Sequence, residues 1–540
     1  MKNKIIVFLF VGASLLSSCS KMLEEKTYDF ISPNNFYQNG EDAIAAVSGV
    51  YNVLYSTGVY KAAYWLIDLD SDHASGAGWF LGSIGAGNPL AYWGINTIWN
   101  DHYLLIARAN GVLANVPNIK MNEELKQRLL GEAYFLRGWA YFNLVRIYGG
   151  VPLRDKTLAS GALIDQPRAS VSETYNFIIS DLKKAEEMLF PHDDSRSGEK
   201  GRVTKAVASA TLAKVYITMA SGALKGASIT VRGGQNNTFY TYAKDVVKGY
   251  EGFNSLELYE EARKITANLI LSKEYSLFPN FMDLWTIENR NRVEHMWQIQ
   301  ALNGNPDLQN DLNYYFNAAK EDRSNVGAVW MSNNHYNNYE DHDHRVLYGV
   351  RHQFIVNYGD PNNNGFLLYP ERDSLKYKTD AAGNVYSFNG DYHDHGYSEK
   401  YSKVSDPKPQ NSDAFFPELR FAEVFLMHAE AENEVNGPTP AAYASLNEIR
   451  TRSKASTVPT GMSKQDFRSF VLEERGRELV FEGKRRFDLL RWGIYLQVMN
   501  QIAVDKDNIS KVRAKRNLLF PIPIDEINSN KAINENNPDW

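Results

Sequence analysis

The chain has 540 residues, of which 44% are hydrophobic and 23% are charged. This length is ample for a large core in one big or two ordinary domains, and the modest share of Gly and Pro excludes collagen-like and disordered classes. A net charge of −6 without a long basic run argues against binding along a nucleic-acid backbone. A single cysteine excludes an intrachain disulfide framework, a zinc finger and an iron–sulfur site.

The first 18 residues have the pattern of a secretory signal peptide. Lys2 and Lys4 precede an apolar run from Ile5 to Leu16, which is shorter than the roughly 20 residues that a membrane-spanning helix needs. The run ends in Leu16-Ser17-Ser18-Cys19, which resembles a bacterial lipobox. We therefore expect Cys19 to carry the lipid that anchors the mature protein; an incidental cysteine in an ordinary signal peptide is the alternative.

The hydrophobic pattern of most of the mature chain predicts amphipathic helices. The clearest is Glu123–Tyr148, which is strongly periodic and ends at Gly149-Gly150. Ser170 to Glu173 is a capping box that begins a helix running to Leu189. The other predicted helices are Asp42–Tyr55, Ile95–Val116, Val203–Ala220, Leu256–Leu271, Phe421–Val435, Ala441–Arg452 and Lys464–Met499, the last interrupted at Gly483.

Small residues recur at a fixed spacing on three of these helices. Alanines seven residues apart share a helix face and let a neighbouring helix approach closely, which favours tetratricopeptide-like stacking. The full 34-residue consensus is absent, so an irregular helical bundle remains the alternative. We predict a mainly α fold, with a tetratricopeptide-like helical scaffold, a large irregular loop-rich insertion and minor β structure. The alanine pairs are Ala133/Ala140, Ala206/Ala213 and Ala422/Ala429.

Two segments depart from the helical pattern. Residues 280–417 are rich in Asn, Asp, Gly, Tyr and His, with short β-like pieces at Gln353–Tyr358 and Phe366–Tyr369. Residues 73–100 form a second loop-rich block with many aromatic residues. Recognition commonly occurs in such segments. The predicted organisation is a signal peptide (1–18), an N-terminal helical part (19–279) with the aromatic loop 73–100, an insertion (280–417) and a C-terminal helical region (418–540).

The C-terminal region resembles the SusD/RagB family. The resemblance rests on the run Glu474–Gly493, on Phe520–Pro523 with the ending Asn537–Trp540, and on Trp139–Pro152. It extends over essentially the whole mature chain. It implies a surface-exposed outer-membrane lipoprotein that captures nutrient, usually glycan, and forms a hinged lid on a SusC-like TonB-dependent transporter. In such proteins the ligand surface draws on the regions corresponding to 73–100 and 280–417.

The charged residues of the Glu474–Arg491 block have the spacing of helix-stabilising ion pairs. Residues three or four apart lie on one face of a helix, where each opposite-charge pair contributes about 0.2–0.5 kcal/mol when exposed and more is at stake when buried. We therefore predict a structural role for the block rather than a catalytic one. The predicted pairs are Glu473/Arg477, Glu482/Arg486 and Asp488/Arg491.

Aromatic rings beside amide side chains suit sugar binding, because a pyranose ring offers an apolar face edged with hydroxyl groups. We predict glycan contacts by Trp79, Trp93 and Asn96 in the first loop region, and by Trp330 and Tyr336 in the insertion. The alternative for each ring is packing between loop and scaffold. Trp99 begins a helix, and we expect it in the core.

Metal and catalytic motifs are few. Asp360, Asn362, Asn364 and Glu371 fit the spacing of a calcium loop, although an Asx-rich turn explains the same residues. The His-Asp clusters at 341–344 and 393–395 are better explained as polar loops than as a zinc site. No Gly-x-Ser-x-Gly, His-Glu-x-x-His or phosphate loop is present. Apart from a structural calcium, no cofactor is expected.

These patterns favour a binding protein over an enzyme. We predict a lipid-anchored glycan receptor on the cell surface that delivers its ligand to a SusC-like transporter. A peptide-binding RagB-like receptor for a peptide importer is the first alternative, and a surface hydrolase is the second. The sequence by itself does not distinguish sugar from peptide, because both ligands would bind in the loop regions.

Overall fold

The computed structural model covers most of the chain from Phe36 onward. Its described residues are 36–540 without 62–67, 82–83, 93, 235, 318–325, 352, 357–364, 369–376, 380–384 and 388–395. The lipid site, one glycan candidate, the calcium candidates and the second His-Asp cluster lie outside the described residues: Cys19, Trp93, Asp360, Asn362, Asn364, Glu371 and 393–395. Within the described part, no helix is long and apolar enough to cross a membrane.

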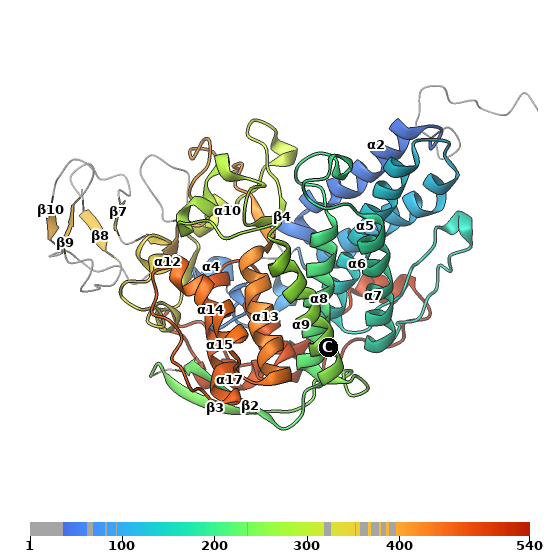
Figure 1. The fold of residues 1–540 in the computed structure, drawn as a ribbon. Coiled ribbons are helices and arrows are strands. Elements are labelled where there is room, and N and C mark those ends of the chain that lie inside the picture. The colour runs from blue at the N-terminus through green and yellow to red at the C-terminus, as the bar shows by residue number, and fades with distance from the viewer. Residues whose placement is uncertain are drawn as a thin grey trace, which may run out of the picture.

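A row of helices packed side by side forms the centre of the molecule (Figure 1). Helices that follow one another in the sequence also lie side by side in space. Each helix from α5 to α9 packs against the next one. The mainly helical fold that the sequence predicts is confirmed. The bounds are α2 Gly40–Asn52, α5 Ile95–Asn115, α6 Glu123–Tyr148, α7 Val171–Met188, α8 Lys205–Ala223, α9 Ser255–Ser272, α13 Phe421–Asn436 and α14 Pro440–Arg452.

Small residues allow these helices to approach closely. All six of the alanines spaced seven apart are buried. On α6, a Cβ added to Gly138 would lie 3.3 Å from the Asp181 Cβ of α7, and one added to Gly131 would lie 3.0 Å from the Leu189 side chain. At these distances an added Cβ would crowd its neighbour. The α6 backbone therefore packs directly against side chains of α7 and of the residue that follows it.

The helix ends follow the local signals with one exception. The capping box of α7 is formed, since Ser170 Oγ accepts from the Glu173 N–H at 3.1 Å and Glu173 Oε2 accepts from the Ser170 N–H at 2.8 Å. The predicted helix 464–499 is interrupted at Gly483 as expected, but a second break at Gly493 divides it again. Both glycines have positive φ, +69° and +65°. The pieces are α15 Lys464–Leu479, α16 Arg485–Arg491 and α17 Tyr495–Ile502.

The described strands form two-stranded antiparallel sheets. The predicted β-like pieces in the insertion are strands β7 (Gln353–Val356) and β8 (Gly365–Leu368), which pair with each other. Four further pairs lie in and beside the insertion. They are β1 (Ala74–Gly76) with β5 (Val329–Met331), β4 (His295–Ile299) with β12 (Phe416–Arg420), β6 (Val350–Arg351) with β11 (Tyr397–Ser398), and β9 (Tyr377–Thr379) with β10 (Val385–Ser387).

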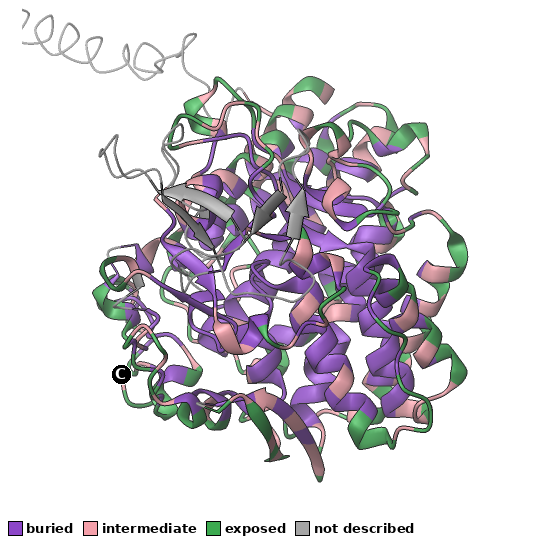
Figure 2. Cartoon of the chain, turned by 90° about the vertical axis from the view of Figure 1, so that its left-hand side faces the viewer, coloured by how far each residue is buried: buried purple, intermediate pink, exposed green. Residues whose placement is uncertain are grey.

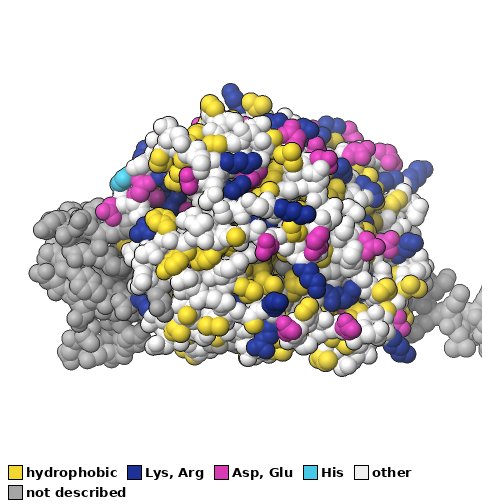
Figure 3. Space-filling model, turned by 90° about the horizontal axis from the view of Figure 1, so that it is seen from below, with side chains coloured by type: hydrophobic (Ala, Val, Ile, Leu, Met, Phe, Trp, Pro, Cys, Tyr) yellow, Lys and Arg dark blue, Asp and Glu magenta, His cyan; other side chains and the backbone are white. Residues whose placement is uncertain are grey.

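The hairpin of β2 (Ala227–Gly233) and β3 (Thr238–Lys244) lies outside the predicted elements. Its signal was present, because Ile229 and Val231 alternate with polar residues and a Gly-Gly pair follows. The hairpin lies at the lower edge in Figure 1, and Figure 3 views that side of the molecule. There, acidic, basic and apolar side chains are interspersed.

The main core draws on the whole length of the described chain, from Ala43 to Ile522 (Figure 2). Trp99 is buried in it, as expected, and its ring packs edge-on against Tyr148 at 5.0 Å. Residues 280–417 contribute to the same core, among them Trp285. The insertion is thus attached to the scaffold through a shared apolar interior.

The charged side chains of the Glu474–Arg491 block are buried and bind distant parts of the chain. Arg420 at the end of β12 is completely buried and contacts Glu294 at 2.6 Å, Glu478 at 2.9 Å and Glu482 at 2.8 Å. A buried ion pair has lost its hydration, so it needs several partners for each charge to offset that cost. Arg420 has three such partners. The predicted structural role of the block fits this arrangement.

Most of the predicted local pairs within the block are wrong. Asp488 and Arg491 do pair, at 2.9 Å. The glutamates, however, lie on the buried side of the segment and bind cations from other elements, as Glu482 binds Arg420. Helical spacing alone therefore identified charged partners but not which side of the segment faces the core. The two pairs that are not formed are Glu473/Arg477 and Glu482/Arg486.

The same block holds the segment that leads into residues 73–100. Arg485 contacts Asp72 at 2.7 Å, and Arg486 contacts Asp70 at 2.9 Å. All four side chains are buried. The start of the aromatic loop region is therefore fixed to the C-terminal helices.

Candidate binding surface

The two loop regions singled out in the sequence meet in the structure. Strand β1 (Ala74–Gly76) pairs antiparallel with β5 (Val329–Met331), with Ser75 opposite Trp330. The Ser332 hydroxyl donates to the Asp72 carbonyl at 2.8 Å, which extends the contact beyond the strands. Residues from 73–100 and from the insertion can therefore act on one ligand.

An exposed tryptophan lies directly after this strand pair. Trp79 is on the short helix α4 (Gly78–Leu81), and 70% of its surface is exposed. Its neighbour Phe80 meets the Trp79 ring edge-on at 5.4 Å and stacks on Tyr315 of α10 (Leu312–Phe316), with ring centroids 4.3 Å apart and planes at 21°. Tyr314 meets Tyr315 edge-on at 4.9 Å. The stacked pair holds α4 against α10 while the Trp79 ring faces solvent.

Tyr92 and Asp311 border these rings. Tyr92 is buried, and burial is the main reason that its pKa is raised, with the Asp311 carboxylate and Tyr315 adding to the effect. Burial likewise raises the pKa of Tyr315. Both phenols are therefore neutral at physiological pH, and each can donate a hydrogen bond as well as accept one. Asp311 contributes a negative charge beside the aromatic surface.

The other predicted glycan contacts are placed differently. Trp330 is 5% exposed, and its indole N–H donates to Asp507 at 2.9 Å; Tyr336 is 1% exposed and lies in the main core. Both rings pack as the alternative interpretation expects, so in this conformation neither offers a face to a sugar. Asn96 is half-buried in the first turn of α5. Its side chain makes no hydrogen bond with the described residues.

The rings that complete the surface were not selected from the sequence. Phe80 follows Trp79 directly, and Tyr314-Tyr315 lies in the insertion, so a signal of adjacent aromatics existed for each. What the sequence could not show is that α4 and α10 meet, because the two segments are more than 200 residues apart.

The first His-Asp cluster serves ion pairs. Asp343 is bound by Arg345 at 2.7 Å, and His342 lies 3.1 Å from Glu340. Among the described residues no group of three or more His, Cys, Asp or Glu side chains is arranged to hold a metal ion. Only part of the cluster is the polar loop that the sequence suggests: His342 is exposed, whereas Asp343 is buried and caps the short helix that begins at His344.

Comparisons with known proteins point to one family. Residues 293–540 match a model described as the SusD family, and residues 88–217 match one described as starch-binding associating with outer membrane. A SusD-like protein of Formosa agariphila is 24% identical over 592 residues, covering 99% of this chain and 98% of the relative. The starch-binding protein SusD of Bacteroides thetaiotaomicron is 30% identical over 141 residues, 24% of each chain.

Solved structures share the fold. A SusD homolog from Bacteroides thetaiotaomicron matches with a TM-score of 0.74 and 23% identity, over 94% of this chain and 98% of that one. A laminarin-binding SusD-like protein matches with a TM-score of 0.67 and 21% identity, over 93% of this chain and all of the other. At these identities the likeness establishes the architecture, and the ligand has to be argued from the chain's own residues.

Proposed function

The chain belongs to the SusD family, and from this premise we propose that it is a cell-surface lipoprotein that binds glycan and delivers it to a SusC-like TonB-dependent transporter. The observation that carries the proposal is the exposed Trp79 ring at the junction of the two loop regions. The proposal keeps the predicted organisation into residues 1–18, 19–279, 280–417 and 418–540. It assigns no catalytic step to the protein.

Sugar binding at this surface would combine stacking with hydrogen bonding. The Trp79 ring offers a flat apolar face for the C–H side of a pyranose. The predicted contacts Trp93 and Asn96 would add a second ring and an amide. Because Asp311 places a negative charge beside the rings, we expect neutral glycans to bind here in preference to acidic ones. Names of relatives that include starch and laminarin agree with this expectation.

The placement in the outer membrane rests on the N-terminal pattern. Lipid attached to Cys19 would tether the protein, and one family model carries an outer-membrane description.

Affinity gel electrophoresis tests the ligand. The protein is run through gels that contain neutral or acidic polysaccharides, beside the variant Trp79→Ala and the control Phe239→Ala. Phe239 is an equally exposed aromatic, but it lies on the separate hairpin strand β3. We expect one neutral polysaccharide to retard the wild type and the control, and Trp79→Ala to weaken binding about tenfold, the upper range for one aromatic contact.

Each outcome of the gel experiment supports a different interpretation. Retardation that survives in Trp79→Ala would keep the glycan ligand but remove this surface as its site. Equal losses in Trp79→Ala and Phe239→Ala would indicate a general loss of aromatic surface rather than a site. No retardation by any polysaccharide would contradict the proposal and favour the peptide receptor, for which a pulldown from a peptide pool is the next measurement.

A further inference from the structure

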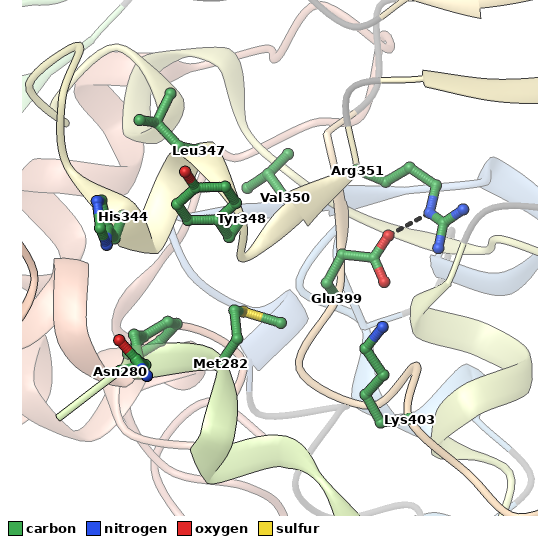
Figure 4. Close-up of a pocket in the computed structure, with 10 residues that line it drawn as sticks. Asn280, Met282, His344, Leu347, Tyr348, Val350, Arg351, Glu399 and Lys403 are labelled. Atoms are coloured by element: carbon green, nitrogen blue, oxygen red, sulfur yellow. Dashed lines mark hydrogen bonds and ion pairs between the residues drawn. The ribbon is translucent and has the colours of Figure 1, made fainter. Parts of the chain in front are cut away.

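A cleft of about 630 Å³ opens in the insertion, separate from the Trp79 surface. Its volume falls in the range of about 300–1,000 Å³ that is typical of small-molecule sites. Figure 4 shows Asn280, His344 and Tyr348 toward one end, and Arg351, Glu399 and Lys403 at the other. These residues come from the start of a 3-10 helix (Phe281–Trp285), from α12 (His344–Leu347) with the residue after it, from β6, and from the segment after β11.

The first end of the cleft provides an aromatic face and an amide. Tyr348 is 51% exposed, and the His344 ring meets it edge-on at 4.9 Å, which limits its rotation. Asn280 donates its side-chain N–H to Asp283 at 3.0 Å, so its amide oxygen can still accept a bond from a ligand. Met282 and Leu347 add apolar side chains to the lining of the cleft. A ring with hydroxyl groups fits this combination.

The other end of the cleft carries a surplus positive charge. Arg351 and Glu399 form an ion pair with each other. Lys403 is exposed and forms no ion pair with any described residue. Burial and the nearby Lys454 lower the pKa of His344, so its imidazole is neutral at pH 7. The described side chains that line this end of the cleft therefore include two cations and one carboxylate.

We propose that this cleft binds a carboxylated sugar, a uronic acid residue within an oligosaccharide. The Lys403 ammonium would bind the carboxylate, the Tyr348 ring would stack on the sugar, and Asn280 would accept a bond from a hydroxyl group. The charge preference is opposite to that expected at the Trp79 surface, where the neighbouring charge is acidic. The protein would then hold two sites of different specificity, one in this cleft and one at the Trp79 surface.

Isothermal titration with trigalacturonate and with its methyl ester tests this assignment, because the ester keeps the rings and removes the charges. The purified protein with its natural N-terminus is titrated beside Lys403→Gln, Tyr348→Ala and Trp79→Ala. We expect the acid to bind about tenfold more tightly than the ester, and Lys403→Gln to abolish that difference, as for the loss of one charged hydrogen bond. Tyr348→Ala should weaken binding of the acid, whereas Trp79→Ala should leave binding of the acid unchanged and weaken only the neutral ester that the Trp79 surface can also bind.

The assignment is overturned if acid and ester bind equally, if Lys403→Gln keeps the preference for the acid, or if trigalacturonate does not bind. A loss of binding in Trp79→Ala alone would also overturn it, because the acid would then occupy the other surface. Lys403 and Tyr348 are exposed, so both variants should fold, and an unchanged melting temperature verifies this. Failure here leaves the neutral-glycan proposal untouched, since that proposal is tested with neutral polysaccharides and does not involve Lys403 or Tyr348.

Discussion

Replacing Arg420 by Met should destabilise the fold severely. Arg420 has no exposed surface, and its guanidinium bonds to the carboxylates of Glu294, Glu478 and Glu482. Met has a similar length and fills most of the space, so the main effect is the loss of the charge. Removing one partner of a buried ion pair costs about 3–5 kcal/mol, because the remaining charge is left without compensation.

The magnitude follows from what remains after the substitution. Lys400 still contacts Glu482, and Arg452 still contacts Glu294 at 2.9 Å and Glu478 at 2.6 Å. Arg345 also still contacts Glu478, at 3.2 Å. Each glutamate therefore keeps at least one cation, and the cluster becomes more negative by one charge rather than leaving three carboxylates without a partner. The double variant Arg420→Met/Glu482→Gln removes that surplus charge, and we expect it to recover part of the lost stability.

Guanidinium unfolding followed by circular dichroism at pH 7 measures the effect. The control is Lys264→Ala, which removes a half-exposed cation from its helical neighbours Glu260 and Glu261 and should cost no more than about 0.5 kcal/mol. The reasoning is refuted if Arg420→Met costs no more than Lys264→Ala. It is also refuted if the double variant is less stable than the single one.

The loss should depend on pH in a defined direction. Burial alone would raise the pKa of Glu482, but Arg420 and Lys400 outweigh it and hold the pKa below its usual value. A lowered pKa in the folded state stabilises the protein above the unfolded value of about 4.3, and this contribution is lost as the pH falls below it. The difference between wild type and Arg420→Met should therefore be largest at neutral pH and should shrink below about pH 4.

Two further predictions concern the contact between the C-terminal block and the N-terminal loop segment. Gly476→Ala should lower the melting temperature, since its Cβ would lie 2.3 Å from the His73 ring, whereas the helical control Gly49→Ala has open space and should be neutral or stabilising. Burial raises the pKa of Asp68 to about 7 even though the Gly483 N–H donates to it. Its stabilising contribution is complete below about pH 4 and is lost as the pH rises to about 7, so Asp68→Asn should flatten the stability profile across this window in denaturation curves.

Local signals predicted the helices well because they are read from neighbouring residues. The periodicity and the Gly149-Gly150 stop placed the ends of α6, and the capping box of Ser170 placed the start of α7. The hairpin β2–β3 was missed even though its pattern alternates. The second break at Gly493 was missed as well, because a glycine inside a helical pattern does not show whether its φ is positive.

The candidate surface was only partly predictable for a different reason. The Gly-rich surroundings of Trp79 suggested an exposed ring, and that ring is exposed. Trp330 has a similar environment of polar neighbours, yet it is buried, because β5 pairs with β1 and the indole binds Asp507 from near the end of the chain. Burial of this kind is decided by contacts between segments more than 170 residues apart, which no local window contains.

The fold separates side chains that are buried in ion pairs from a side chain that is exposed for a ligand. Arg485 and Arg486 hold Asp72 and Asp70 and thereby fix the start of the aromatic loop. Trp79 follows only seven residues beyond Asp72, and 70% of its surface is exposed. An anchor with several buried ion pairs tolerates little change, because each loss leaves a charge without a partner. An exposed ring on the anchored loop has no such constraint, so the scaffold can keep its core while the ligand-binding side chains vary.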